Sequence, residues 1–255
     1  MISAESVAKP LRSVGGFFAM SLDTYVAMFK LPFPWREFLL QTWFVARVSI
    51  IPTLLLTIPF TVLVVFTVNI LLVEFGAADF SGTGAATASV TQIGPVVTVL
   101  VVAGTGATAM CADLGARAIH DELDALRVMG VDPVRRLAAP RVLAATVVAV
   151  SLVSLVTLVG LAGSFFFSVF VQHVTPGAFA AGLTLLTHLP DLILGLVKGA
   201  LFGMAAALIA CYKGISVGGG PQGVGNAVNE TVVYSFIALF VINIVATAVF
   251  YTGPQ

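Results

Sequence analysis

The sequence predicts an all-α membrane protein with five transmembrane helices. Of its 255 residues, 59% are hydrophobic and only 9% are charged, whereas a soluble domain carries about 25% charged residues. Apolar runs long enough to cross a bilayer, which takes about 20 residues, recur along the chain. The net charge is zero, so the composition gives no reason to expect nucleic acid as a partner. We therefore expect one transmembrane domain, residues 47–255, preceded by a segment, residues 1–46, that lies at the membrane surface.

The N-terminal segment has the pattern of an amphipathic helix. Between Val14 and Phe29 apolar residues recur at helical spacing, but polar residues are too frequent for the helix to cross a bilayer. Trp35 and Trp43, the two tryptophans of the chain, follow close to Arg36 and Arg47. Tryptophan is enriched at the membrane–water interface, so this segment is expected to lie on the cytoplasmic membrane surface.

Five apolar runs follow. The predicted spans are residues 48–73, 94–116, 142–171, 192–212 and 231–251. Pro52 and Pro59 are expected to kink the first span. The second span starts at Gly94-Pro95, where proline loses little because first-turn N–H groups have no partner inside a helix. It is rich in Gly, Ala and Thr, which indicates close packing against other helices.

The orientation follows from the distribution of Lys and Arg. The loop 115–141 and the loop that begins at Lys213 contain six of these residues, and the loops 74–91 and 172–190 contain none. Positively charged loops stay in the cytoplasm. The N-terminus and the loop 115–141 are therefore predicted to be cytoplasmic and the C-terminus to lie outside.

The loop 115–141 holds a second predicted helix. Asp121, Glu122 and Asp124 lie at its start and Arg127 near its end, which suits the helix dipole. Gly130 is suited to end the helix. An apolar stripe runs along one face, formed by Ile119, Leu123, Leu126 and Met129. The stripe favours docking on a partner in the aqueous phase, although a solvated loop that only obeys the charge rule would also be charged.

The run ELDALRVMGVDPVRRLAAPR, residues 122–141, resembles the signature of the MlaE/YrbE permeases, the membrane subunits of ABC-type lipid transporters that work with MCE proteins. The resemblance extends from about Trp35 to the C-terminus. In that family this helix is the coupling helix, which sits in a groove of the cytoplasmic ATPase. The resemblance therefore assigns coupling to Asp121, Glu122, Leu123, Asp124, Leu126, Arg127, Met129 and Gly130.

The same resemblance implies the partners. A P-loop needs a Gly-Lys dipeptide, and this chain has none, so we expect a non-catalytic subunit. ATP and Mg²⁺ would be bound by a separate ATPase, and this chain would bind no cofactor or metal of its own. A second YrbE-type permease, MCE proteins on the outer face and membrane lipids are the other expected partners. The implied location is the plasma (inner) membrane.

Two criteria, the family pattern and charge inside a span, select the residues of a possible lipid path or gate. Ionisable groups inside a span usually face protein or water, which singles out Asp113 and Lys198. Lys198 is expected by default to snorkel to the surface, and the alternatives are that it pairs with Asp191 or Glu74 or lines the path. The family commonly has Arg where this chain reads Gly104-Thr105-Gly106, and an acid where it has Gln92, before Pro95. These departures suggest a non-identical partner that keeps the charges, as in the paired A- and B-type YrbE subunits of actinobacterial Mce systems.

Two other classes of function stay open. An ATPase-independent secondary transporter or flippase would need ionisable residues near the middle of the membrane, for which the sequence offers Asp113 and Lys198. A membrane-embedded lipid-modifying enzyme would need Asp113, Asp121, Glu122 and Asp124 to hold Mg²⁺. The Gly-rich run from Gly218 fits a dinucleotide fingerprint by letter, but no βαβ unit surrounds it.

Overall fold

The protein is a bundle of long helices. The computed structural model describes residues 4–30, 33–76, 80–171, 173–186 and 189–252, and all regular structure in those ranges is helical. Five helical runs there are long and apolar enough to cross a membrane: Trp35–Leu72, Gly82–Ile119, Val134–Val171, Leu189–Ile215 and Gly220–Phe250. The predicted all-α fold with five spans is confirmed, and the chain is a multi-pass membrane protein.

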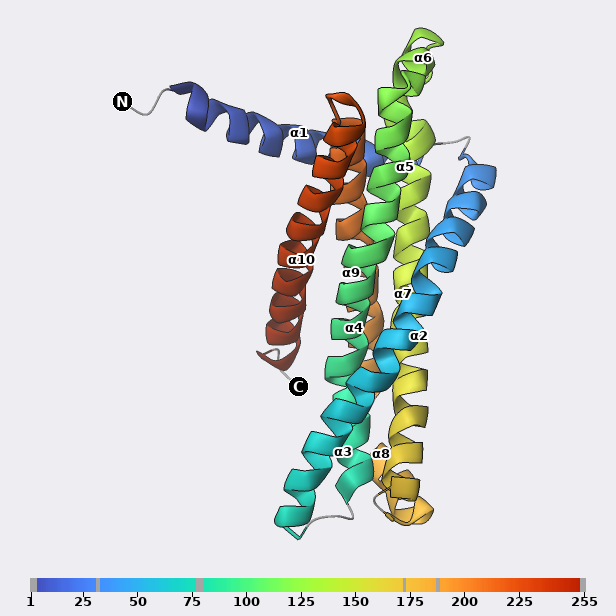
Figure 1. Ribbon diagram of the computed structural model, residues 1–255, viewed down its shortest axis with the longest axis vertical. Helices are drawn as coiled ribbons and strands as arrows, with labels where there is room; N and C mark the ends of the chain where they lie inside the picture. The colour runs from blue at the N-terminus through green and yellow to red at the C-terminus, as the bar shows by residue number, and fades with distance from the viewer. Residues whose placement is uncertain (1–3, 31–32, 77–79, 172, 187–188, 253–255) are drawn as a thin grey trace.

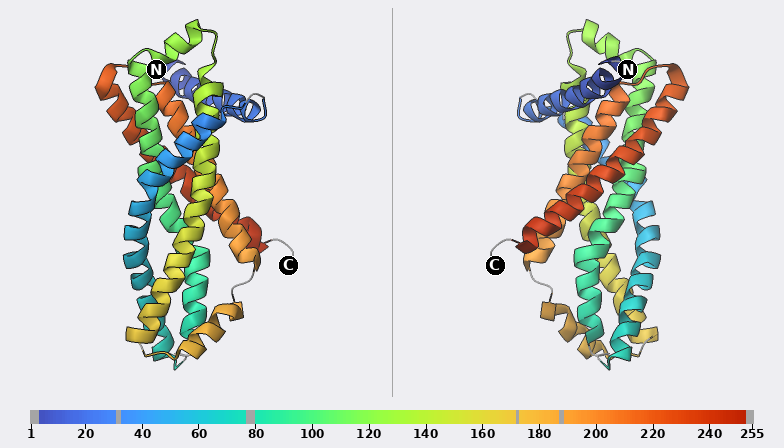
Figure 2. Two further views of the ribbon diagram at one scale, coloured as in Figure 1. Left: turned by 90° about the vertical axis from the view of Figure 1, so that its right-hand side faces the viewer. Right: turned by 90° about the vertical axis from the view of Figure 1, so that its left-hand side faces the viewer.

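The first helix, α1 (Ala4–Met28), lies across one end of the bundle (Figures 1 and 2). It contacts the start of the third span and the end of the fourth. Phe18 and Leu22 on its outer face are 61% and 65% exposed, whereas Thr24 and Ala27 are buried. The helix is thus amphipathic, as its sequence pattern predicts, and its location at the membrane surface stays a prediction.

The first span is part of one continuous helix, α2 (Trp35–Glu74), which begins thirteen residues before the predicted start at residue 48. The segment with both tryptophans is therefore the first part of the spanning helix. Pro52 and Pro59 lie inside α2. A stripe of buried hydroxyl residues follows one face of this helix, at Ser49, Thr53, Thr57 and Thr61. Thr53 and Thr57 donate to the carbonyl oxygens of the residues four earlier, each at 2.6 Å, so these hydroxyls are satisfied within the helix.

The second span is longer than predicted. Its helical run joins α3 (Ser81–Thr87), η2 (Ala88–Ile93), α4 (Gly94–Val101), η3 (Val102–Ala107) and α5 (Thr108–Ile119). The stretch expected to be an outer loop is thus helical from Ser81. The cause is tertiary: α3 packs beside α8 (Pro176–Leu186) at the opposite end of the bundle from α1 (Figure 2). Thr83 Oγ1 donates to the Gly182 carbonyl at 2.9 Å.

Two segments of the second span, η2 and η3, have the wider π-helical turn. Pro95, which follows η2, has no N–H to donate to a carbonyl four residues earlier, and this favours a locally widened turn. The segment η3 contains Gly104 and Gly106. π-helical turns inside longer helices often occur at functional sites.

Glycines bring the third and fourth spans close together. The third span consists of η4 (Val134–Ala138), α7 (Ala139–Phe166) and η5 (Phe167–Val171), and the fourth is α9 (Leu189–Ile215). Gly195, Gly199 and Gly203 of α9 face α7 at intervals of four residues; a Cβ at Gly203 would lie 2.5 Å from the Ala145 carbonyl oxygen. The last span, α10 (Gly220–Thr252), packs on α9 and α5 and leaves one apolar face uncovered.

Candidate functional site

The predicted coupling helix is α6 (Glu122–Val128), which projects from the α1 end of the bundle (Figure 1). Asp121 precedes it in a left-handed conformation with φ 57°, and Gly130 follows it with φ 75°. The Gly130 N–H donates to the Arg127 carbonyl at 3.0 Å and the Val131 N–H to the Leu126 carbonyl at 2.9 Å. This pair of bonds is the Schellman motif, so Gly130 ends the helix as predicted.

The apolar stripe of α6 is divided between the bundle and the solvent. Leu123 is only 4% exposed and Leu126 packs against the core, so these two residues attach α6 to the bundle. The expectation that they are free for docking is wrong. Val128 and Met129 are 88% and 67% exposed and form the apolar part of the surface, beside the Asp124–Arg127 ion pair at 2.7 Å. We call Asp124, Arg127, Val128 and Met129 the outer face of α6.

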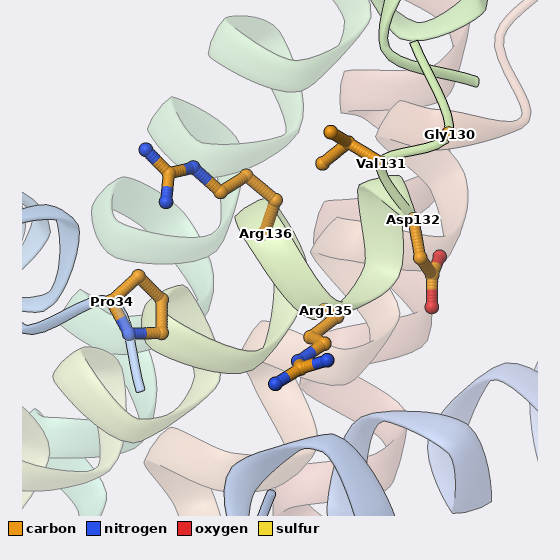
Figure 3. A pocket seen from close by; sticks show the side chains of 6 residues that line it. All are labelled: Pro34, Gly130, Val131, Asp132, Arg135 and Arg136. Atoms are coloured by element: carbon orange, nitrogen blue, oxygen red, sulfur yellow. The ribbon is translucent and has the colours of Figure 1, made fainter. Parts of the chain in front are cut away.

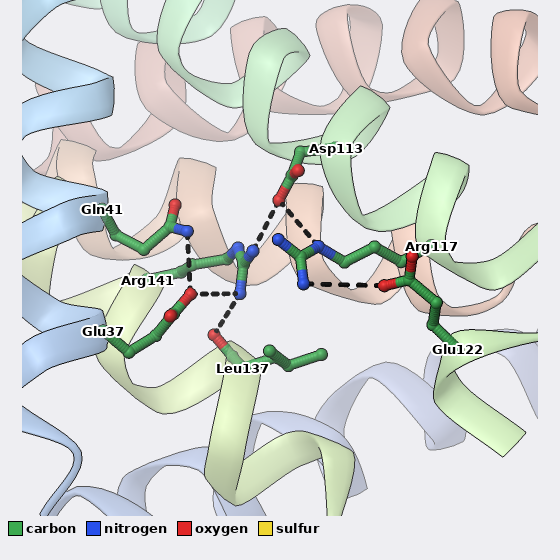
Figure 4. Close-up of polar contacts among 7 residues, drawn as sticks. All are labelled: Glu37, Gln41, Asp113, Arg117, Glu122, Leu137 and Arg141. Atoms are coloured by element: carbon green, nitrogen blue, oxygen red, sulfur yellow. Dashed lines mark hydrogen bonds and ion pairs between the residues drawn. The ribbon is translucent and has the colours of Figure 1, made fainter. Parts of the chain in front are cut away.

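A chain of ion pairs leads from α6 into the bundle (Figure 4). Its centre is Arg141 of α7, whose side chain is completely buried. Arg141 Nη2 donates to Asp113 Oδ2 at 2.5 Å, and Nη1 lies 3.5 Å from Glu37 Oε1. Nη1 also donates to the Leu137 carbonyl at 3.1 Å. A buried guanidinium is stable only with such partners, because removing it from water is unfavourable.

The network reaches α6 through Arg117 of α5. Arg117 Nε lies 3.4 Å from Asp113 Oδ2, and Arg117 Nη1 lies 3.7 Å from Glu122 Oε2. Gln41 extends the chain at its other end, donating to Glu37 Oε1 at 2.9 Å. The network therefore connects α6 to three spanning helices, α5, α7 and α2, through charged side chains.

A basic cleft of about 350 Å³ lies beside α6 (Figure 3). It is lined by Pro34, Gly130, Val131, Asp132, Arg135 and Arg136. The Asp132 carboxylate accepts a hydrogen bond from the Val134 N–H at 3.0 Å and caps the start of η4. Arg136 extends to the side where Pro34 lies, away from Asp132 (Figure 3). Two guanidinium groups and one carboxylate line the cleft, so its lining has a net positive charge.

The comparison with known families decides the assignment. The family model described as "Permease MlaE" matches residues 38–249, most of the chain and all of the site just described except Pro34 and Glu37.

The chain belongs to the MlaE permease family.

Relatives of this MlaE-family protein carry consistent names. A "Probable ABC transporter permease protein" of Synechocystis is 31% identical over 74% of this chain and 73% of its own. A protein of the same description from Rickettsia bellii is 27% identical over 94% of this chain and 93% of its own. The "Intermembrane phospholipid transport system permease protein MlaE" of Haemophilus influenzae is 28% identical over 71% of this chain and 70% of its own. This chain is accordingly an ABC permease of the MlaE family.

The MlaE-family permease does not bring the predicted lipid-path residues together. Gln92 and Asp113 lie about 30 Å apart along the second span, at 1.5 Å per helical residue. Gln92 is exposed in η2 and Pro95 is buried after it, while Asp113 belongs to the ion-pair network at the α6 end. A Cβ at Gly104 would meet nothing within 4 Å, and one at Gly106 would lie 3.6 Å from Ser49 Oγ of α2.

Lys198 lies inside the protein. It is 2% exposed, so it does not snorkel, and its Nζ donates to Thr247 Oγ1 of α10 at 2.7 Å. Within the described residues no carboxylate lies within 4.0 Å of this ammonium group, and so the pairing with Asp191 or Glu74 that the sequence left open is not formed. The described residues also contain no group of three or more His, Cys, Asp or Glu placed to hold a metal ion.

The sequence did not single out Glu37, Arg117 or Arg141 as site residues. Arg141 had one usable signal, because it is a charged residue that enters an apolar span directly after Pro140. A charge at such a position usually has a partner. The identity of that partner could not be read from the sequence, since Glu37 and Asp113 lie 104 and 28 positions away.

Proposed function

We propose that this MlaE-family permease is the membrane subunit of an ATP-driven lipid transporter and that α6 is its coupling helix. The observation that carries the proposal is the combination of an exposed outer face on α6 with the ion-pair network behind it. One side of the helix is free to meet an ATPase, and the other side is linked to the spans. ATP and Mg²⁺ would be held by that separate ATPase.

The proposed stroke begins when ATP-driven closure of the ATPase displaces α6. Leu123 and the Arg117–Glu122 pair pass the displacement to α5, and Asp113 passes it through Arg141 to α7 and α2. Within the second span, the π-helical segments η2 and η3 are where the helix can change its winding. This would alter the surface around Gln92, Pro95, Gly104 and Gly106, the proposed gating region.

The proposed cargo is a lipid. The spans offer mostly apolar walls, which suit an acyl chain better than a sugar or an ion, and the Haemophilus relative is named for intermembrane phospholipid transport. By the sequence resemblance, the partner in the membrane would be a second, non-identical YrbE-type permease. MCE proteins would receive or supply the lipid at the outer face. The chain would sit in the plasma membrane with its N-terminus in the cytoplasm.

The test replaces two residues on the outer face of α6. The variant Asp124→Arg with Met129→Glu reverses one charge and adds another on an exposed surface, so the fold should be unaffected. We expect at least tenfold weaker co-purification of the ATPase and loss of lipid-dependent ATP hydrolysis in proteoliposomes. The matched control is Asp23→Arg, a charge reversal at an exposed position of α1. If the α6 variant retained ATPase binding and transport at the control level, α6 would not be the coupling helix.

A further inference from the structure

An apolar groove of about 720 Å³ lies between α1, α9 and α10, apart from the ion-pair network. Its wall on α9 runs from Leu201 to Lys213, with lining residues at the three- and four-residue spacing of one helix face. Residues of α10 between Tyr234 and Ile242 form a second wall, and α1 forms the third. The volume is that of a ligand site, which is typically about 300–1,000 Å³.

The groove changes from polar to apolar along its length. Its end nearest α1 carries Ser13, Tyr212, Lys213 and Tyr234, whereas Leu201 and Ile242 line the deep end. The thirteen residues from Leu201 to Lys213 span about 18 Å of helix. One leaflet of hydrocarbon is about 15 Å thick, half of the bilayer core. The groove thus has the length and the polarity gradient of a single lipid leaflet.

At the polar end of the groove, specific contacts join α1 to α9. The Tyr212 hydroxyl donates to the Ser13 carbonyl at 2.8 Å, and the rings of Phe17 and Tyr212 meet edge to face at 5.7 Å. Gly16 allows this approach, because a Cβ there would already lie 3.1 Å from the Tyr212 hydroxyl oxygen. These contacts fix α1 to the end of α9. From Ser13 to Tyr25, α1 lines the groove.

The ammonium group of Lys213 lies at the same end of the groove. Lys213 Nζ lies 2.5 Å from Glu230 Oε2 and 4.6 Å from the centre of the Tyr234 ring. The Glu230 carboxylate is half exposed, and the Lys213 ammonium group has three N–H donors. The ammonium group therefore retains donors for a second anion. Burial raises the pKa of the Tyr25 phenol, which lines the groove as a neutral hydroxyl.

The groove opens on an exposed apolar surface of the spanning helices. Phe18 and Ile237, which line it, are 61% and 58% exposed. The exposed apolar face of α10 continues from Ile237 to Phe240 and Ile244. A lipid of the surrounding leaflet can therefore enter sideways without crossing a polar barrier.

We propose that this groove binds a phospholipid of the leaflet at the α6 end, the cytoplasmic leaflet in the predicted orientation. One acyl chain lies along α9 toward Leu201, and the phosphate meets the Lys213 ammonium group. This site lies outside the ion-pair network and does not depend on the coupling role of α6. A lipid fits the groove better than a second copy of the chain does. The polar end of the groove lies about one leaflet thickness from its apolar end, which is where a lipid carries its headgroup.

Native mass spectrometry of the full chain in detergent, titrated with dioleoylphosphatidylglycerol, tests the proposal. We expect one tightly retained lipid per chain. The double variant Ala205→Phe with Ala238→Phe fills the groove and should lower the apparent affinity at least tenfold. The matched control Ala248→Phe adds the same side chain at an exposed position of α10 outside the groove and should leave the affinity unchanged. Equal lipid retention by the double variant and the control would overturn the proposal.

A second measurement uses the unaltered chain and so does not depend on the folding of a variant. A phosphatidylglycerol with a diazirine in its acyl chain, placed in nanodiscs, should label Leu208, which is only 6% exposed and lines the groove. Free inorganic phosphate should not compete, because the acyl chain supplies most of the contact. Absence of adducts at Leu208, competition by phosphate alone, or an Ala238→Cys disulfide between two copies would each contradict lipid occupancy.

Discussion

At the scale of single residues, the most consequential side chain is the buried Arg141. Arg141 forms ion pairs with two carboxylates, those of Asp113 and Glu37. Asp113 also pairs with Arg117. Removing one partner of a buried ion pair is far more destabilising than removing a partner of an exposed one, since the remaining charge stays out of water. The two types of pair occur in this protein close together, which allows a direct comparison.

Asp113→Asn should destabilise the protein by about 3 kcal/mol, the lower end of the range for a broken buried pair, because Glu37 still lies near Arg141. Asp124→Asn is the matched control. Its ion pair with Arg127 is exposed on both sides, so the loss should stay below about 1 kcal/mol. Unfolding by denaturant in detergent measures both. Equal midpoints for the two variants would show that Arg141 does not rely on Asp113.

At the scale of helices, the glycines of α9 determine how closely two spans pack. Gly195, Gly199 and Gly203 place the backbone of α9 against α7, and Gly214 does the same against Cys111 and Leu114 of α5. In a membrane, where no hydrophobic effect drives helices together, close backbone packing is a main source of association.

Gly203→Ala should lower the free energy of unfolding by about 1–3 kcal/mol, the usual effect of overpacking. The new methyl group would lie 2.5 Å from the Ala145 carbonyl oxygen and would push α9 away from α7. Gly225→Ala in α10 should have the opposite sign, up to about 1 kcal/mol of stabilisation, because alanine is the better helix former and a Cβ there meets nothing within 4 Å. The same unfolding assay compares them, and destabilisation of both to the same extent would contradict the packing explanation.

At the scale of the whole molecule, the charged groups gather at one end. Helix α6 lies at the α1 end, and α3 and α8 form the other end (Figures 1 and 2). The ion-pair network joins α6 to the spans, and the basic cleft is lined by residues that follow α6. The distribution of Lys and Arg predicts that the α1 end is cytoplasmic.

Single cysteines test this orientation in intact cells and inverted membrane vesicles. Val128→Cys on α6 should react with a membrane-impermeant maleimide only in inverted vesicles, and Ala180→Cys on α8 only in intact cells. Both positions are exposed, and the native Cys111 and Cys211 are buried, so the unsubstituted chain should give a low background. Labelling of Val128→Cys from outside the cell would reverse the orientation and remove the basis for docking a cytoplasmic ATPase.

Much of the fold could be predicted because it depends on local properties of the chain. Apolar runs, the helical spacing of α1 and the glycine that ends α6 act within one or two turns, so the sequence could predict the existence and order of the five spans and of α6. The boundaries were less accurate where helices continue past the apolar core. Near the start of α2, Glu37 pairs with Arg141, and in the helical segment from Ser81, Thr83 bonds to Gly182, so both segments contact distant parts of the chain.

The sequence by itself determined that this protein crosses the membrane five times, carries a short charged helix between the second and third spans, and resembles the MlaE/YrbE permeases. Only the tertiary structure decided which side of that helix is free, that Arg141 joins Glu37 to Asp113, and that a groove remains under α1. The physical reason is the range of the forces involved. Hydropathy and helix capping act between neighbouring residues, whereas the pairing of a buried charge and the filling of a groove depend on residues that only folding brings together.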